Sequence, residues 1–349
     1  HLEELEGDGA IMRLKDVCEF IVDCPHSTAK DEGQGYPLIR TPNIGKGRFN
    51  LEGVHRVSED VYRKRNLRAT PQDNDLIFAR EAPAGNVAII KNGEKYCLGQ
   101  RTVLIRPNCE YVYPDFLTYY LLAPQQQYGL LGMANGATVA HVNLPVIREL
   151  EITLPPIETQ RRIANILSAY DDLIENNQKQ IKLLEEAAQR LYKEWFVDLR
   201  FPGYENTKIV DGVPEGWKEG ALGDIAIFKR GKTITKAQVH NGNIPVVAGG
   251  LEPAYYHNKA NTSAPVITVS GSGANAGFTR LYNVDVFASD CSFVDRETTD
   301  YLFFVYVFLK ANKAALDILQ KGAAQPHVYA KDINALRLNI PSEMLLKAY

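Results

Sequence analysis

The longest regular pattern of apolar residues lies in the middle of the chain, from Ile157 to about Phe196. Apolar or aromatic residues recur there with a seven-residue period, and they fill nine of the ten positions of one seam. The seam consists of Ile163, Leu167, Tyr170, Ile174, Asn177, Ile181, Leu184, Ala188, Leu191 and Trp195. An ordinary surface helix has 3.6 residues per turn and drifts off such a stripe. The pattern therefore predicts a long coiled-coil helix that packs against a partner helix.

The ends of this segment agree with a helix of that length. Pro155 and Pro156 lack the amide hydrogens that a preceding turn would need, and Glu158 places negative charge where the helix dipole favours it. Pro202-Gly203 ends any helix that continues beyond Phe196. About 40 residues at ~1.5 Å each give a rod of about 60 Å. The alternative is an amphipathic helix lying on one globular core, and the strongly charged opposite face argues against it.

Shorter patterns flank the helix on both sides. Before it, β-branched and aromatic residues bounded by Gly, Pro and Asn predict short strands within residues 36–49, 75–90 and 97–107. Residues 113–122 predict a short amphipathic helix, and the alternation in ELEITLP predicts a strand that closes the region. The predicted fold class is α+β, with mostly short strands and a few helices.

The regions before and after the long helix repeat one another. LKDVCEF at residues 14–20 corresponds to LGDIAIF at residues 222–228. The closing segments match at a constant offset of 186 residues, through Gly136 and Gly322, Ala137 and Ala323, His141 and His327, Val142 and Val328, Ile147 and Ile333, Leu150 and Leu336, and Pro155 and Pro341. The interiors differ. A duplicated scaffold with unlike interiors predicts two copies of one binding device for two ligands.

The repeat sets the expected domain organisation. Residues 1–11 are expected to be a tag or linker, 12–156 a first recognition domain, 157–200 the spacer helix, 201–221 a linker, and 222–341 a second recognition domain. Residues 342–349 are expected to begin a second helical region that is truncated here. A second long helix would be the natural antiparallel partner of the first.

Composition and charge narrow the class of protein. The formal net charge is −3, and it becomes +1 when the four acids of the first eleven residues are left out. Neither value is typical of a protein that coats nucleic acid, so positive charge for such a ligand would have to be local or come from a partner. The five cysteines are odd in number and scattered, which fits a reducing cytoplasm. No apolar run approaches the ~18 residues of a membrane span.

These features together resemble the DNA-specificity subunit of type I restriction-modification systems. Residues 154–198, residues 214–232 and the closing segments around His141 and His327 carry the resemblance, which spans nearly the whole chain from about Arg13. It implies two target-recognition domains that each read one half of a split DNA sequence. It also implies conserved helices that hold these domains apart as a ruler and dock methyltransferase subunits. The chain departs from the pattern because the second conserved helix is missing.

The resemblance also implies the partners and cofactors. They are double-stranded DNA, the methyltransferase subunits and, through the complex, the restriction subunits. S-adenosylmethionine, ATP and Mg²⁺ are expected in those subunits and not in this chain. The unpaired long helix could also promote self-association, and a cytoplasmic location is expected. Independently, a rod of about 60 Å equals about 17 base pairs of duplex at ~3.4 Å each, so it could space two half-sites about one helical turn apart.

Candidate DNA contacts are basic and polar residues in turn-rich segments, because Arg and Asn can bind base edges and Lys suits phosphates. In the first domain they are Arg40, Asn43, Lys46, Arg48, Arg63, Lys64, Arg65, Arg68, Arg80 and Asn86. In the second they are Lys229, Arg230, Lys232, Lys236, Ser270, Ser272 and Asn275. The alternative for each is a solvated surface group. For His141 and His327, a shared structural role beside the closing strand is favoured over a functional one.

Other signals are incomplete. RGKT at residues 230–233 lacks the first glycine of a phosphate-binding loop, and Cys18, Cys24 and His26 lack a fourth metal ligand nearby. No catalytic residue and no metal ligand is predicted. Two other functions stay open: a nuclease or methyltransferase with an unrecognised site, and a coiled-coil adaptor that binds proteins without DNA specificity.

Overall fold

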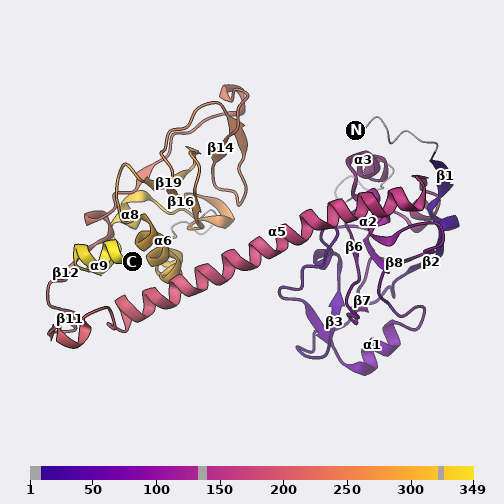
Figure 1. The fold of residues 1–349 in the computed structure, drawn as a ribbon, viewed down its shortest axis with the longest axis horizontal. Coiled ribbons are helices and arrows are strands. Elements are labelled where there is room, and N and C mark those ends of the chain that lie inside the picture. The colour runs from indigo at the N-terminus through magenta and orange to yellow at the C-terminus, as the bar shows by residue number, and fades with distance from the viewer. Residues whose placement is uncertain (1–8, 133–139, 321–325) are drawn as a thin grey trace. The chain divides into compact units, whose positions relative to one another are not determined.

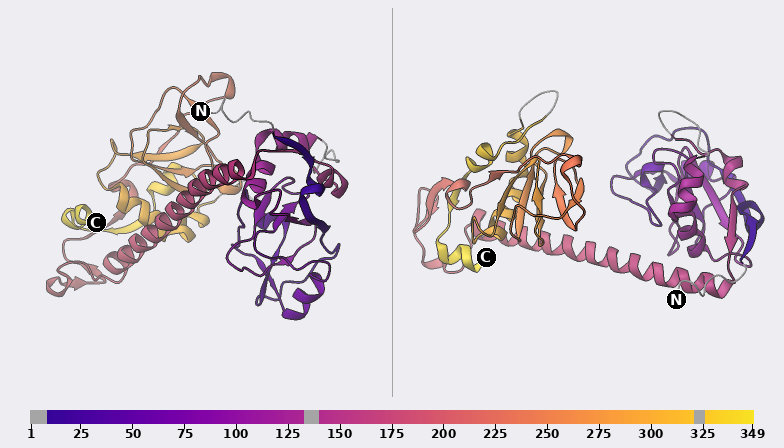
Figure 2. Two further views of the ribbon diagram at one scale, coloured as in Figure 1. Left: turned by 45° about the vertical axis from the view of Figure 1, so that its right-hand side comes forward. Right: turned by 90° about the horizontal axis from the view of Figure 1, so that it is seen from above.

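A computed structural model describes residues 9–132, 140–320 and 326–349. The chain divides into two compact units, residues 1–176 and 177–349. One helix, α5 (Ile157–Tyr192), crosses the boundary between them and continues through a π-helical turn at Lys193–Val197. Figures 1 and 2 show α5 as a single unbroken rod. At ~1.5 Å per residue, its 36 residues span about 54 Å. The predicted long helix is confirmed.

The first unit is built on three sheets. A four-stranded antiparallel sheet has the order β2-β8-β5-β6, a three-stranded sheet has the order β4-β3-β7, and β1 pairs with β9. Their bounds are β1 (Ala10–Arg13), β2 (Cys18–Asp23), β3 (Tyr36–Ile39), β4 (His55–Val57), β5 (Leu76–Ala79), β6 (Val87–Ile89), β7 (Cys97–Leu98), β8 (Thr102–Pro107) and β9 (Glu151–Leu154). The helices are α1 (Glu59–Arg65), α2 (Pro114–Leu122), α3 (Pro124–Gly132) and α4 (Leu144–Arg148).

The second unit has sheets of the same order. Its four-stranded sheet is β13-β19-β16-β17, its three-stranded sheet is β15-β14-β18, and β12 pairs with β20. The bounds are β12 (Lys218–Ala221), β13 (Lys229–Arg230), β14 (Ile244–Val247), β15 (Tyr255–His257), β16 (Val266–Ser270), β17 (Thr279–Tyr282), β18 (Phe287–Ala288), β19 (Cys291–Asp295) and β20 (Arg337–Ile340). A small β10 (Ile209–Val210) and β11 (Val213–Pro214) hairpin precedes them. The helices are α6 (Leu302–Ala311), α7 (Lys313–Ile318), α8 (Ala330–Asn334) and α9 (Glu343–Ala348).

Matching backbone hydrogen bonds align the two units residue by residue. Leu14 N donates to Leu150 O at 2.9 Å, and Leu222 N donates to Leu336 O at 2.8 Å. Both leucines are fully buried at the start of a 3-10 turn. Gly136, Ala137, Gly322 and Ala323 lie outside the described residues. The α+β fold with two similar units and a long helix is confirmed.

The central strands of each four-stranded sheet are buried on both faces; they are β5 and β8 in the first unit and β16 and β19 in the second. In the first unit, Leu76 and Phe78 pack on one face with Leu117 of α2. Ile77 packs on the other face with Ile39 of the small sheet. Helices, four-stranded sheet and three-stranded sheet therefore form three layers.

Both units hold α5 by packing and by one tyrosine. Ala164 is buried in the first core, and Tyr119 of α2 donates to Asp171 at 2.7 Å. Tyr192 is buried in the second core, and Tyr306 of α6 donates to Glu185 at 2.5 Å. The two ends of one helix thus belong to two different cores.

Several expected boundaries fall close to structural ones. β1 begins at Ala10, inside the stretch assigned to a tag or linker. The predicted helix at 113–122 appears as α2, and the closing strand as β9. Residues 343–348 form α9, and Tyr349 after it donates to Ala188 O of α5 at 2.8 Å.

Within the residues that the structure describes, none of the helices has the length and apolar content that crossing a bilayer requires.

Candidate nucleic-acid interface

Three loops of the first unit meet where its central strands end. Arg80, directly after β5, donates its backbone N–H to Arg101 O at 3.0 Å. Gly99 N, just after β7, donates to Ile39 O at 2.8 Å, and Thr41 Oγ1 donates to Ala82 O at 3.3 Å. We call the group of loops 40–43, 80–86 and 99–101 the first rim. It gathers main-chain turns and charged side chains that are far apart in the sequence.

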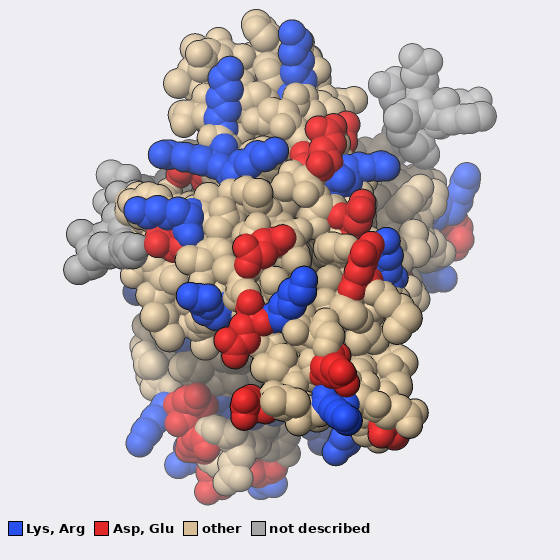
Figure 3. Space-filling model, turned by 90° about the vertical axis from the view of Figure 1, so that its left-hand side faces the viewer, with Lys and Arg blue, Asp and Glu red and all other residues tan. Residues whose placement is uncertain are grey.

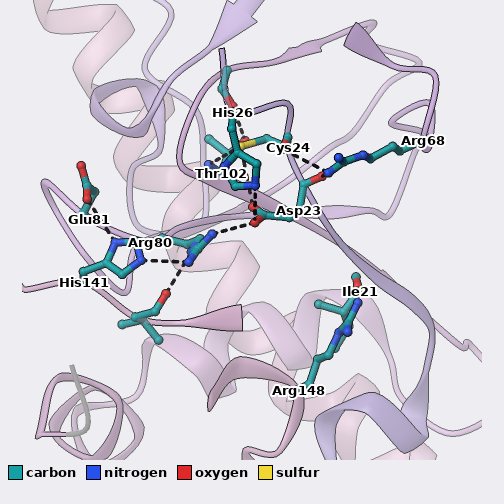
Figure 4. Close-up of polar contacts among 12 residues, drawn as sticks. Ile21, Asp23, Cys24, His26, Arg68, Arg80, Glu81, Thr102, His141 and Arg148 are labelled. Carbon is teal, nitrogen blue, oxygen red and sulfur yellow. Dashed lines mark hydrogen bonds and ion pairs between the residues drawn. The ribbon is translucent and has the colours of Figure 1, made fainter. Parts of the chain in front are cut away.

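An ionic network organises the first rim (Figure 4). The guanidinium of Arg80 donates to Asp23 Oδ2 at 2.7 Å and to Val142 O at 3.0 Å, and it lies 2.8 Å from His141 Nε2. Glu81 pairs with Arg101 and lies 3.1 Å from His141 Nδ1. With its side chain only 11% exposed, Arg80 is a strut between β2, the loop after β5 and the closing segment.

The surroundings of His141 disfavour its charged form. Burial lowers its pKa, and the neighbouring charges of Arg80 and Arg101 lower it further. A neutral ring can accept from Arg80 at Nε2 and donate from Nδ1 to Glu81. His141 therefore has a structural role, as the sequence favoured for this residue.

Several predicted DNA contacts are engaged within the first unit. Arg65 is 7% exposed and donates to Leu98 O at 2.8 Å and to Ser27 O at 2.9 Å. Arg48 pairs with Asp172 and with Glu175 of α5, the latter at 2.9 Å. A further four residues bond their own unit: Asn43 to Asn50 O, Asn86 to Ile44 O, Arg63 to Glu59, and Arg68 to Asp23 O. These side chains shape the unit before any ligand arrives.

Three predicted contacts remain open. Lys46 and Lys64 are exposed, and Arg40 is half-buried on the first rim. The Nε of Arg40 is buried and finds no hydrogen-bond partner among the described residues. A buried donor without an acceptor costs free energy, so the Arg40 side chain is left with one unsatisfied polar group in this arrangement.

The second unit carries its basic residues on and after β13. Lys229, Arg230, Lys232 and Lys236 are all exposed. Across the face drawn in Figure 3, Lys and Arg side chains gather toward the top and are mixed with Asp and Glu elsewhere. Because the formal net charge is −3, positive charge for a nucleic-acid ligand has to be concentrated locally, and these exposed basic residues provide such a concentration.

The predicted polar loop of the second unit bonds mainly to its own rim. Ser270 Oγ donates to Gly249 O at 3.1 Å, and Asn275 Nδ2 donates to the same oxygen at 3.4 Å. Ser272 Oγ donates to Asp290. Residues 248–250, 271–275 and 289–290 form the second rim, which is rich in glycine and serine where the first rim is charged.

A family model described as type I restriction modification DNA specificity domain matches residues 7–186 and 214–343. The chain belongs to this family.

Relatives in this family are similar along much of the chain. A type I restriction enzyme MjaIX specificity subunit of Methanocaldococcus jannaschii is 29% identical over 256 residues, which cover 70% of this chain and 58% of that protein. A putative MjaX specificity subunit of the same organism is 25% identical, covering 97% of this chain and 84% of that protein. The crystal structure of an S subunit from M. genitalium aligns with a TM-score of 0.59 at 17% identity, covering 97% and 86% of the two chains. The last likeness supports the shared fold.

The seam of α5 is largely open in this family member. Ile163 packs against the first core, and Ala188 and Trp195 pack in the second unit. The remaining seam residues are exposed within the described chain: Leu167, Tyr170, Ile174, Asn177, Ile181, Leu184 and Leu191. Their predicted partner helix stays a prediction.

The carboxylates that hold the side chains of each rim in place were not identified from the sequence. Asp23, Glu81 and Asp290 hold Arg80, His141 and Ser272 in place. The one available signal was position, because each lies at or next to a strand end. Among the described residues, no group of three or more His, Cys, Asp or Glu side chains is arranged to hold a metal ion.

Proposed function

We propose that this chain supplies DNA sequence specificity to a type I restriction-modification complex, with each unit reading one half of a bipartite target. The observation that carries the proposal is the repetition of one sheet topology with unlike rims. Identical frameworks with different side chains at the same edge suit two half-sites of different sequence. The first unit offers Arg40, Lys46 and Lys64, and the second offers Lys229, Arg230 and Lys232.

These residues divide between two tasks. Arg40 lies half-buried on the rim, and an arginine guanidinium suits a base edge such as guanine O6 and N7. The exposed lysines suit phosphates, which position the protein without reading sequence. These exposed side chains would provide local positive charge for DNA on a chain whose formal net charge is −3.

The seam of α5 suits helices of the methyltransferase subunits. It leaves Leu184 70% exposed and Ile181 58% exposed, which is more apolar surface than a solvated helix needs. S-adenosylmethionine, ATP and Mg²⁺ would be bound by the methyltransferase and restriction subunits, and this chain would be non-catalytic. The length of α5 would set the gap between half-sites.

Reconstitution tests the proposal. The chain is mixed with the methyltransferase subunits of its system, and duplexes bound by the complex are selected from a random library. We expect enrichment of two short half-sites at a fixed spacing, with weaker duplex binding by the chain alone. Equal binding of selected and random duplexes would contradict the proposal, and turnover of DNA by the isolated chain would favour an enzyme.

A further inference from the structure

The two rims have matching backbone hydrogen bonds but differ in the side chain at one position. That side chain determines whether the rim contains a cavity. Arg80 N donates to Arg101 O at 3.0 Å, and Arg80 O accepts from Val142 N at 2.9 Å. Gly271 makes the same two bonds, to Asp290 O at 3.2 Å and from Val328 N at 3.1 Å. Gly271 therefore stands where the first unit has Arg80.

The neighbours of this position correspond as well. Cys24, the residue after Asp23, donates its N–H to Thr102 O. Gly231, the residue after Arg230, donates its N–H to Cys291 O in the same way. Arg230 thus replaces Asp23. His327 and Val328 stand for His141 and Val142, at the offset of 186 residues. Every group that binds the Arg80 guanidinium in the first unit has a counterpart in the second.

The missing side chain leaves a cavity. A pocket of about 350 Å³ opens in the second unit, lined by Arg230, Gly271, Ser272, Asp290, Cys291, Ser292, His327, Val328, Tyr329 and Ala330. Its lining includes the counterparts of all three groups that hold Arg80. The pocket therefore includes the position that corresponds to the Arg80 side chain, and it is large enough for a small ligand.

The charges of this pocket favour a neutral ligand with donors and acceptors. The first unit balances Arg80 against Asp23 and Arg101 against Glu81. The second replaces Arg80 by Gly271 and Glu81 by Ser272, which removes one cation and one anion. Arg230 stands in place of Asp23 and Asp290 in place of Arg101, so one cation and one anion line the pocket, one a donor and the other an acceptor.

An aromatic wall completes the pocket. The rings of His327 and Tyr329 lie 6.0 Å apart and nearly parallel, at 12°. Tyr329 is 42% exposed, so its ring is accessible from solvent. Aromatic side chains of this kind stack on nucleobases.

We propose that this pocket binds a purine base, with guanine preferred. Guanine offers O6 and N7 as acceptors for Arg230, and its N1–H and N2 amino group as donors for the Asp290 carboxylate. Adenine presents an amino group where guanine has O6, so it opposes Arg230. The base could come from a free guanine nucleotide or from a nucleotide of DNA, and only the second source rests on the proposed function.

Calorimetric titration of the full chain with GMP, AMP, CMP and UMP tests the proposal. We expect one GMP site, with AMP at least tenfold weaker. Gly271→Arg places an arginine in the pocket as in the first unit. Its Cβ would lie 3.3 Å from the Asp290 carbonyl oxygen, which must shift by a few tenths of an ångström, so circular dichroism and urea denaturation check that the variant folds. This variant should weaken GMP binding at least tenfold. Gly132→Arg adds the same side chain at an open site in α3 and should bind GMP normally.

A second variant tests recognition instead of access. Asp290→Asn keeps the shape of the side chain but loses the carboxylate, so the preference for GMP over AMP should fall, with Arg230 still opposing adenine, while circular dichroism stays unchanged. Absence of GMP binding by the wild-type chain, equal binding of all four nucleotides, or normal GMP binding by Gly271→Arg would each overturn the proposal.

Competition with duplex distinguishes the two sources. If guanine comes from DNA, saturating GMP weakens binding of the selected duplex; if it is a free nucleotide, GMP binds without affecting the duplex. Either result supports the pocket. If the wild-type chain binds GMP but its reconstituted complex binds selected and random duplexes equally well, that result would count against the proposed function and not against the pocket.

Discussion

At the scale of single residues, neighbours in the sequence have opposite roles. Lys64 is exposed at the end of α1, whereas Arg65 beside it is buried with its guanidinium on two backbone carbonyls. The packing of α1 against β7 decides between them, and composition cannot. A dense cluster of basic residues in a sequence thus includes side chains that stabilise the fold through internal hydrogen bonds.

Alanine substitution should separate these two neighbours. Arg65→Ala leaves the carbonyls of Leu98 and Ser27 unpaired and opens a cavity, so we expect a loss of about 2–4 kcal/mol in the free energy of unfolding. Lys64→Ala should change it by less than about 0.5 kcal/mol. Urea denaturation measures both, and equal losses would contradict the assigned roles.

Arg40 should act on DNA and not on stability. Arg40→Ala should lower affinity for the selected duplex by about 1–3 kcal/mol, or about 5–150-fold, and relax specificity at one base position. Arg63→Ala is the matched control, because Arg63 is exposed and paired with Glu59. Fluorescence anisotropy of the reconstituted complex gives both affinities. An unchanged affinity for Arg40→Ala would remove it from the interface.

The thiols give a test of the fold that needs no ligand. Burial raises the pKa of Cys18 and Cys291 to about 12 and that of Cys97 to about 11, and it also raises the pKa of Cys24. Thiolates are the reactive form, and these four thiols, three of them buried and Cys18 partly buried, stay protonated at pH 8. Iodoacetamide should therefore modify only Cys109, which is exposed, until the chain is denatured. Rapid modification of several cysteines in the native chain would contradict this packing.

At the scale of elements, α5 was predictable and its environment was not. A seven-residue period is local information, so the seam from Ile163 to Trp195 defines the helix by itself. The network of Asp23, Arg80 and His141 joins residues about 60 positions apart. Only the closing of the sheets brings them together, so no spacing in the sequence could reveal it. The cavity at Gly271 depends on the same closure.

The open seam makes a prediction of its own. Leu184→Glu should leave the free energy of unfolding within about 0.5 kcal/mol, since Leu184 is 70% exposed, and should weaken binding to the methyltransferase subunits at least tenfold. Lys182→Glu places the same side chain off the seam and should have little effect. Pull-down with tagged methyltransferase subunits measures the difference. Undiminished binding by Leu184→Glu would move the docking site elsewhere.

At the scale of the whole molecule, duplication is the central feature. One sheet order occurs twice, and the sequence revealed this through identities at the edges while the interiors had diverged. Edges are constrained because Leu14 and Leu222 must close the same hydrogen bond and fill the same core. The rims keep matching backbone hydrogen bonds, but their side chains differ, as the two proposed half-sites would require.

Methylome sequencing tests this account most directly. A host that carries the gene for this chain, together with those of its methyltransferase subunits, is sequenced with a method that detects modified bases. The account predicts one motif made of two unlike half-sites with an unread gap of fixed length, and relaxation of a single half-site in the Arg40→Ala variant. A continuous motif without a gap, or relaxation of both half-sites together, would contradict it.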